Sequence, residues 1–96
     1  MKYNLPDRVY KEIIFFAKKH DIQKVTLFGS RASGTHTERS DIDIAVYGGN
    51  FDDFYWDIKE KVHSLLMFDI VDTDSGISAE LADEIEKNGV VLYEKV

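Results

Sequence analysis

The chain has 96 residues, of which 44% are hydrophobic and 31% charged, and it contains no cysteine. This balance is typical of a soluble globular domain and excludes a disordered chain, disulfide bonds and cysteine-bound zinc. The net charge of −6 disfavours broad contact with phosphates, so we expect no stable nucleic-acid binding. No apolar run approaches the roughly 18 residues of a membrane span, and the first residues lack a signal-peptide core. We therefore expect no membrane contact, a cytoplasmic location and one domain over residues 1–96.

The first predicted element is a helix that begins at Pro6, whose missing N–H is harmless in a first helical turn. Apolar residues then recur at steps of three and four, at Val9, Ile13 and Phe16, and so share one face. Basic residues close the helix, which suits the negative end of its dipole. His20 is expected there as a solvated residue.

A short apolar run over residues 23–28 predicts the first strand, which ends at the Gly29-Ser30 turn. Residues 30–33 are expected to form a single helical turn. The polar segment 34–40 that follows is predicted to be a loop.

The second strand is predicted over residues 41–47, because polar and apolar residues alternate at its start. A strand with this sequence places two sets of side chains on opposite faces: Ile42, Ile44 and Val46 on one, and Asp41, Asp43 and Ala45 on the other. Helices are expected to cover the apolar face. The face with the carboxylates is expected to stay partly open.

The clearest helix is predicted over residues 51–66, where aromatic and aliphatic residues form a core-facing stripe at helical spacing. His63 is expected on the surface of this helix. A third strand over residues 67–72, a helix capped by Ser78 and a last strand over residues 90–93 complete the chain. This order of helices and strands indicates one sheet with helices packed on it.

Three acidic residues in strand-like surroundings carry the chemical interpretation. Asp41 and Asp43 are two residues apart, so on a strand they point the same way, with α-carbons about 6–7 Å apart. Asp69 lies between apolar neighbours in the third predicted strand, where an unpartnered carboxylate is unfavourable if it is buried. Clustered carboxylates repel one another unless a divalent cation neutralises them, and hard oxygen ligands select Mg²⁺ or Mn²⁺. If Asp69 lies beside the other two, it can bind a second ion or accept the proton of an attacking hydroxyl.

The Gly29-Ser30 turn supplies the other half of the predicted site. Glycine lets the backbone approach a phosphate closely, Ser30 offers a hydroxyl and an N–H group, and Arg31 can add a charged contact. Other motifs fail. Thr35 stands where the lysine of a phosphate loop belongs, and we find no calcium loop and no His/Ser/Asp grouping for a covalent nucleophile.

The combination of Gly29-Ser30, ten further residues, Asp41-Ile42-Asp43 and a later strand aspartate at Asp69 resembles the polymerase-beta-type nucleotidyltransferase superfamily. The short length makes the chain similar to the minimal nucleotidyltransferase (MNT) members. The resemblance implies an α/β fold of the α+β type. We expect one minimal nucleotidyltransferase domain with a mixed, twisted sheet of about four strands and helices packed on one face.

The resemblance also implies roles for individual residues. The implied catalytic and metal-binding residues are Asp41, Asp43 and Asp69, and the implied nucleotide-binding residues are Gly29, Ser30, Arg31 and Ser40. The metal would be a pair of Mg²⁺ ions, with Mn²⁺ as a substitute. An acceptor hydroxyl would attack the α-phosphate of ATP, and pyrophosphate would leave. Ser33 departs from the family pattern, in which many members have an arginine.

Minimal members of this superfamily are commonly encoded beside an all-helical HEPN protein. In such pairs the HEPN protein is an RNase toxin, and the MNT protein is the antitoxin that transfers AMP from ATP to a toxin tyrosine. The resemblance therefore implies a protein adenylyltransferase with a HEPN toxin as its partner. Two alternatives stay open: an antitoxin that acts by contact alone, and a transferase that modifies a small-molecule hydroxyl.

Overall fold

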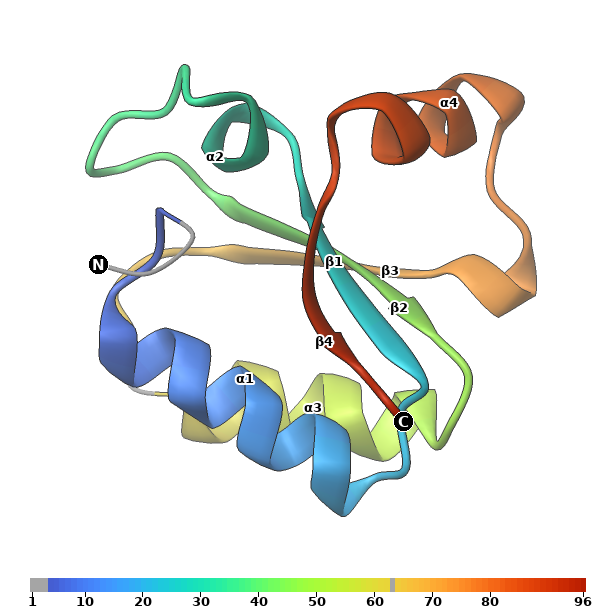
Figure 1. Ribbon diagram of the computed structural model, residues 1–96. Helices are drawn as coiled ribbons and strands as arrows, with labels where there is room; N and C mark the ends of the chain where they lie inside the picture. The colour runs from blue at the N-terminus through green and yellow to red at the C-terminus, as the bar shows by residue number, and fades with distance from the viewer. Residues whose placement is uncertain (1–3, 63) are drawn as a thin grey trace.

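At the centre of the structure, a computed structural model that describes residues 4–62 and 64–96, lies a four-stranded sheet with the order β3-β2-β1-β4 (Figure 1). The strands are β1 (Lys24–Phe28), β2 (Ile42–Tyr47), β3 (Phe68–Asp72) and β4 (Val90–Glu94). β1 is antiparallel to both β2 and β4, whereas β3 is parallel to β2. The mixed sheet that the family resemblance implies is therefore confirmed.

Helices lie on both faces of this sheet. They are α1 (Asp7–Lys19), α2 (Ser30–Ser33), α3 (Phe51–Lys61) and α4 (Ala79–Asn88), with a 3₁₀ turn at Thr73–Ser75. α1 and α3 run side by side on one face, as predicted, whereas α2 and α4 lie on the other (Figure 1). Within the described residues, no helix has the length and apolar character needed to cross a lipid bilayer.

Helix α3 is shorter than predicted. It ends at Lys61, and Val62 already has an extended backbone, although the apolar pattern continues to Leu66. The chain must turn back here, because a parallel β3 has to begin beside the start of β2. Leu65 is consequently exposed and does not join the apolar stripe of the helix. His63, which was expected on the surface of this helix, lies outside the described residues.

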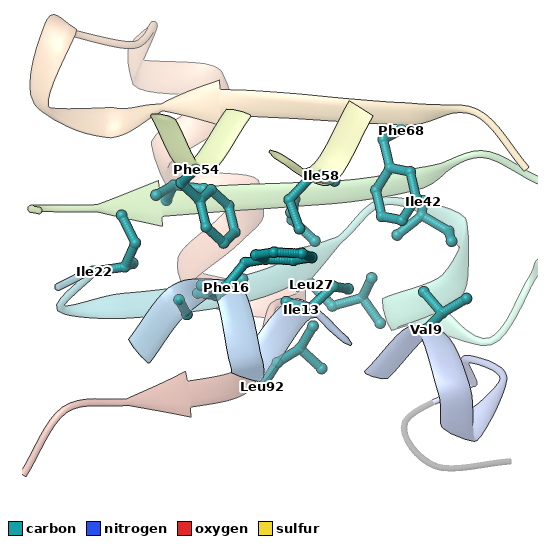
Figure 2. Packing of buried hydrophobic residues seen from close by; sticks show 14 of the residues in the cluster. Val9, Ile13, Phe16, Ile22, Leu27, Ile42, Phe54, Ile58, Phe68 and Leu92 are labelled. Carbon is teal, nitrogen blue, oxygen red and sulfur yellow. The ribbon is translucent and has the colours of Figure 1, made fainter. Parts of the chain in front are cut away.

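The main core lies between the sheet and the layer formed by α1 and α3 (Figure 2). Its members come from both helices and from the central strands, and include Ile13, Phe16, Leu27, Ile42, Phe54 and Ile58. The apolar face predicted for β2 belongs to this cluster, so the predicted alternation is confirmed. Each such side chain stabilises the fold by about 1.5–3 kcal/mol relative to an exposed one.

A smaller apolar cluster lies on the opposite face of the sheet, under α4. It joins Phe28, Ala45 and Ile85. Ser78 caps α4 as predicted, because its hydroxyl accepts a hydrogen bond from the Leu81 N–H at 3.1 Å. Helix α4 therefore covers part of the face that the sequence predicts to carry the carboxylates, and it confines the open part to one end.

A mostly buried polar pair joins α1 to α3. His20 Nε2 lies 2.6 Å from Asp57 Oδ2, and Lys61 forms an ion pair with the same carboxylate at 3.0 Å. The hydrogen bonds from His20 and Lys61 lower the pKa of Asp57 from 3.8 to about 2. His20 was predicted to be solvated. It is paired instead because α3, distant in the sequence, packs beside the end of α1.

Candidate active site

Three acidic side chains meet where two neighbouring strands begin. The parallel register of β2 and β3 sets Asp43 directly beside Asp69, and adjacent strands lie about 4.7–4.9 Å apart. Asp41 precedes β2 and is two residues before Asp43, so it projects to the same face. Asp41 and Asp69 are exposed, and Asp43 is half-buried. The structure thus brings together the three acids that the sequence assigns to one site.

The closeness of these groups changes the pKa of Asp43. Burial raises this pKa above its ordinary value, and the negative charges of Asp69 and Asp41 raise it further. The ionised form of Asp43 is therefore disfavoured in the folded chain unless positive charge comes near it. Among the described residues, no three His, Asp or Glu side chains are arranged as a group that could hold a metal ion.

The chemistry of this donor set fits a hard divalent cation. Carboxylate oxygens are the ligands that Mg²⁺ and Mn²⁺ prefer. Mg²⁺ usually takes only one or two carboxylates and fills its other positions with phosphate oxygens and water. An open trio of acids leaves room for such ligands. Asp41, Asp43 and Asp69 are the donors that would have to converge to hold such a cation, because they do not form a metal-binding group in this conformation.

Gly29 lies against the carboxylate of Asp43. It follows Phe28, which pairs with Asp43 across the β1–β2 ladder. A Cβ atom at Gly29 would come within 2.2 Å of Asp43 Oδ2, and the φ of +73° also favours glycine. Only the smallest residue lets the turn approach the acid this closely, so the predicted turn and the predicted acids form one continuous site.

Ser30 begins α2, which confirms the helical turn predicted at this place. Two N–H groups of the turn donate to the Gly29 carbonyl at 3.1 Å. Ser30 is half-buried beside Gly29. Ser33, which stands where many relatives have arginine, bonds locally, because its hydroxyl contacts the Ser30 carbonyl and the Thr35 hydroxyl.

Arg31 is one of the most deeply buried side chains, with 1% of its surface exposed. Its guanidinium donates hydrogen bonds to four backbone carbonyls, those of Asn4 (2.7 Å), Ser40 (3.0 Å), Glu38 (3.2 Å) and Thr37 (3.4 Å). These bonds tie the loop before β2 to α2 and to the first described residues. Arg31 therefore holds the loop in place. The sequence analysis did not predict this structural role.

Ser40 closes the same loop. Its hydroxyl accepts a hydrogen bond from the Thr37 N–H at 2.9 Å, and its carbonyl accepts one from Arg31. Asp41 is the next residue, so the loop sets the position of this acid. The expected nucleotide contacts of Ser30, Arg31 and Ser40 stay predictions.

An open cavity of about 470 Å³ adjoins Asp41. Its lining comes from the loop before β2 and from the segment before β3: Glu38, Arg39, Asp41, Leu65, Leu66 and Met67. A second hollow of about 590 Å³ lies under α4, at the far ends of the strands, and includes Lys24 and Tyr47. The first cavity is the one that shares an acid with the site.

Residues 11–96 match the protein family described as Polymerase beta, Nucleotidyltransferase. Because this match covers most of the chain, the chain belongs to that family, and the resemblance inferred from the glycine-serine turn and the three acids is confirmed. The family and the fold together indicate a transferase. A comparison with curated proteins gave no match.

Among solved structures, chains from toxin–antitoxin complexes are similar to this chain. One, from a crystal structure of a toxin–antitoxin with AMP-PNP, is 28% identical with a TM-score of 0.68, over 90% of this chain and 73% of its own. A chain from a mutant of the toxin–antitoxin MntA-HpeT is 29% identical with a TM-score of 0.66, and the match covers 95% of this chain and 74% of that chain. A chain from the toxin–antitoxin MntA-HepT is 25% identical with a TM-score of 0.63, and the match covers 94% of this chain and 74% of that chain. The predicted likeness to MNT antitoxins is thus confirmed.

Proposed function

We propose that this chain is a metal-dependent nucleotidyltransferase that transfers AMP from ATP to a hydroxyl of a partner protein, and that the partner is a HEPN-type toxin. The observation that carries the proposal is the side-by-side register of Asp43 and Asp69 next to Gly29. It joins acids that suit a metal to a turn that suits a phosphate, at an open end of one sheet face.

The acids and the turn have different tasks in this proposal. Asp41, Asp43 and Asp69 would hold Mg²⁺, which would neutralise their charge and that of the triphosphate. Ser30 directs its hydroxyl and N–H toward phosphate oxygens, which can approach closely because Gly29 has no side chain. The exposed side of Asp69 leaves the acceptor hydroxyl a path to the α-phosphorus.

The reaction is a substitution at phosphorus. The acceptor oxygen forms a bond to the α-phosphorus of ATP while the bond from that phosphorus to its bridging oxygen breaks, and pyrophosphate leaves with that electron pair. The hydroxyl proton passes to a carboxylate. Asp69 is suited to accept it because β3 is the outer strand of the sheet, where an acceptor can approach. The products are the AMP-modified partner and pyrophosphate.

The choice of a toxin as the partner is supported by the structural neighbours, which are chains of toxin–antitoxin complexes. ATP as the nucleotide is supported by the ATP analogue AMP-PNP in one of those structures. The net charge of −6 agrees with a protein that acts on a protein rather than on nucleic acid. We place this reaction in the cytoplasm.

The test is to incubate the chain with the protein encoded beside it, Mg²⁺ and ATP labelled at the α-phosphate. We expect label on the partner, no label in EDTA, and no label with Asp43→Asn. The control is Asp83→Asn, because Asp83 is an exposed residue of α4 that pairs with Lys87. An unlabelled partner, or label that survives Asp43→Asn, contradicts the proposal.

Two other results would point to the alternatives. If Asp41→Asn combined with Asp43→Asn still silences the toxin in cells, the chain acts by contact alone. If label appears on an aminoglycoside in the absence of a partner protein, the chain is a small-molecule transferase.

A further inference from the structure

Strand β3 forms one outer edge of the sheet, and its backbone groups alternate in direction. The Ile42 N–H donates to the Met67 carbonyl at 2.9 Å, and the parallel register continues from there in steps of two. Odd-numbered residues from Met67 onward therefore turn their N–H and C=O groups toward β2. Even-numbered residues from Phe68 onward turn theirs away from the sheet.

Some of the outward-facing backbone groups of β3 have no hydrogen-bond partner among the described residues. Lys59 Nζ donates to the Phe68 carbonyl, as expected for a group that faces outward. In the described part of the chain, the outward N–H and C=O of Ile70 make no hydrogen bond. An exposed strand edge of this kind pairs readily with another extended segment.

Exposed apolar side chains stand at the start of the same edge. Leu65 and Met67 are 104% and 68% exposed, and both line the cavity that Asp41 also lines. Exposed apolar surface next to a reactive site commonly marks contact with another protein. We name this surface the β3 dock; it consists of Leu65, Met67 and the outward backbone groups of residues 68–72.

We propose that the β3 dock binds an extended segment of the partner protein, and that this segment carries the acceptor hydroxyl. This inference rests on the proposed function and names the surface through which the partner reaches the site. The segment adds a strand beside β3, so its backbone pairs with the free groups of Ile70. An apolar side chain of the segment covers Leu65 and Met67.

The geometry of an added strand brings its side chains to the acids. Such a strand lies about 4.7–4.9 Å from β3, and side chains opposite each other on paired strands project to the same face. The residue opposite Asp69 therefore points to the carboxylate face, on the side of Asp69 away from Asp43. A serine, threonine or tyrosine at this place has its hydroxyl beside the carboxylate proposed to accept its proton.

Charge argues against a second copy of this chain as the occupant. Each chain has a net charge of −6, and β3 carries Asp69 and Asp72 but no basic residue. Edge-to-edge pairing of two copies would bring two clusters of acids together, and like charges on facing strands are destabilising. The same charges favour a basic segment, so we expect lysine or arginine near the acceptor residue.

Surface variants test the apolar part of the dock. Leu65→Ser combined with Met67→Ser changes exposed positions, so the fold should persist. The matched control is Phe15→Ser combined with Trp56→Ser, which removes similarly exposed side chains (62% and 58%) from the α1–α3 layer. We expect the dock variant, and not the control, to bind the protein encoded beside the chain about tenfold or more weakly, measured without nucleotide. Its KM for the partner should rise while its KM for ATP stays unchanged. Wild-type affinity in the dock variant would overturn the proposal.

A second pair of variants tests the added strand. Ile70→Pro removes an N–H that the sheet does not use, and proline is tolerated at such edge positions. Ile70→Ala controls for the lost packing of the side chain. We expect Ile70→Pro to weaken partner binding well beyond Ile70→Ala, and equal binding by the two folded variants would exclude an added strand.

Two further outcomes separate this inference from the proposed function. Because binding is measured without ATP, a chain that binds its partner through the dock but transfers no label contradicts the proposed function and the acceptor role of the segment, and supports the dock as a binding surface alone. Self-association of the purified chain that Ile70→Pro abolishes would assign the edge to a second copy and overturn the dock.

Discussion

The Oδ2 atom of Asp43 lies so close to Gly29 that a Cβ atom added to the glycine would come within 2.2 Å of it. The end of β1 and the start of β2 are thereby joined into one site, because the turn that suits a phosphate touches an acid that suits a metal. The absence of a side chain at Gly29 is what permits this contact.

Gly29→Ala should destabilise the fold more than Gly34→Ala. Gly34 (φ +82°, ψ 9°) lies in the left-handed region, where alanine is strained by about 1–2 kcal/mol. Gly29 (φ +73°, ψ −156°) lies in a region that is essentially restricted to glycine, so its backbone strain is at least as large. At Gly29 the new methyl group also collides with Asp43, whereas no described atom lies within 4 Å of a Cβ at Gly34. Urea denaturation measures the difference, and equal losses of unfolding free energy would contradict the close approach.

Asp43→Asn should raise the free energy of unfolding of the metal-free chain, although we expect it to abolish the proposed transfer. The pKa of Asp43 is raised by burial and by Asp69 and Asp41, so at neutral pH its ionised form weakens the folded state. An amide removes this penalty. Mg²⁺ should in turn stabilise the wild type more than the variant. Thermal unfolding in EDTA and in Mg²⁺ measures both effects, and a variant less stable than the wild type in EDTA would show that repulsion is not dominant.

Asp57→Asn should lower stability near neutral pH, and the loss should fade in acid. Hydrogen bonds from His20 and Lys61 lower the pKa of Asp57 from 3.8 to about 2. An acid with a lowered pKa contributes stability above its unfolded-state pKa and loses that contribution as the pH falls through the folded-state value. The difference in unfolding free energy between wild type and variant should therefore shrink between about pH 4 and pH 2. A difference that does not change over this range would rule out the lowered pKa.

Arg31→Lys should destabilise the fold, because one ammonium group cannot serve the four carbonyls that the guanidinium contacts. A hydrogen bond from a charged donor contributes about 1.5–3 kcal/mol, and water can replace part of a lost bond here because the carbonyls belong to exposed or half-buried residues. We expect a lower unfolding free energy and faster hydrogen exchange of the amides in residues 34–40. Unchanged stability together with weaker ATP binding would instead assign Arg31 to the nucleotide.

The parts of the site that depend on local pattern could be predicted from the sequence. Alternation along β2 put Asp41 and Asp43 on the face opposite Ile42, because side chains on a strand alternate whatever the strand pairs with. The Gly29-Ser30 turn was also predictable, since it ends an apolar run. These features need only a few consecutive residues.

The parts that depend on packing could not be predicted in the same way. The position of Asp69 beside Asp43 needs the register of two strands that are far apart in the sequence, and only the family resemblance pointed to it. The sequence suggested a phosphate contact for Arg31, because nothing near it indicates that backbone carbonyls will surround its guanidinium. The pairing of His20 with Asp57 likewise follows from how α1 and α3 pack.

If Asp41, Asp43 and Asp69 act on one metal–nucleotide site, the loss of Asp69 on β3 must weaken the binding of a metal that Asp41 and Asp43 also hold. The most direct measurement is Mn²⁺ affinity by electron paramagnetic resonance, with a non-hydrolysable ATP analogue present, for the wild type, Asp69→Asn and Asp83→Asn. We predict that Asp69→Asn weakens Mn²⁺ binding by about tenfold or more, while Asp83→Asn leaves it unchanged. Wild-type Mn²⁺ affinity in Asp69→Asn would contradict a shared site.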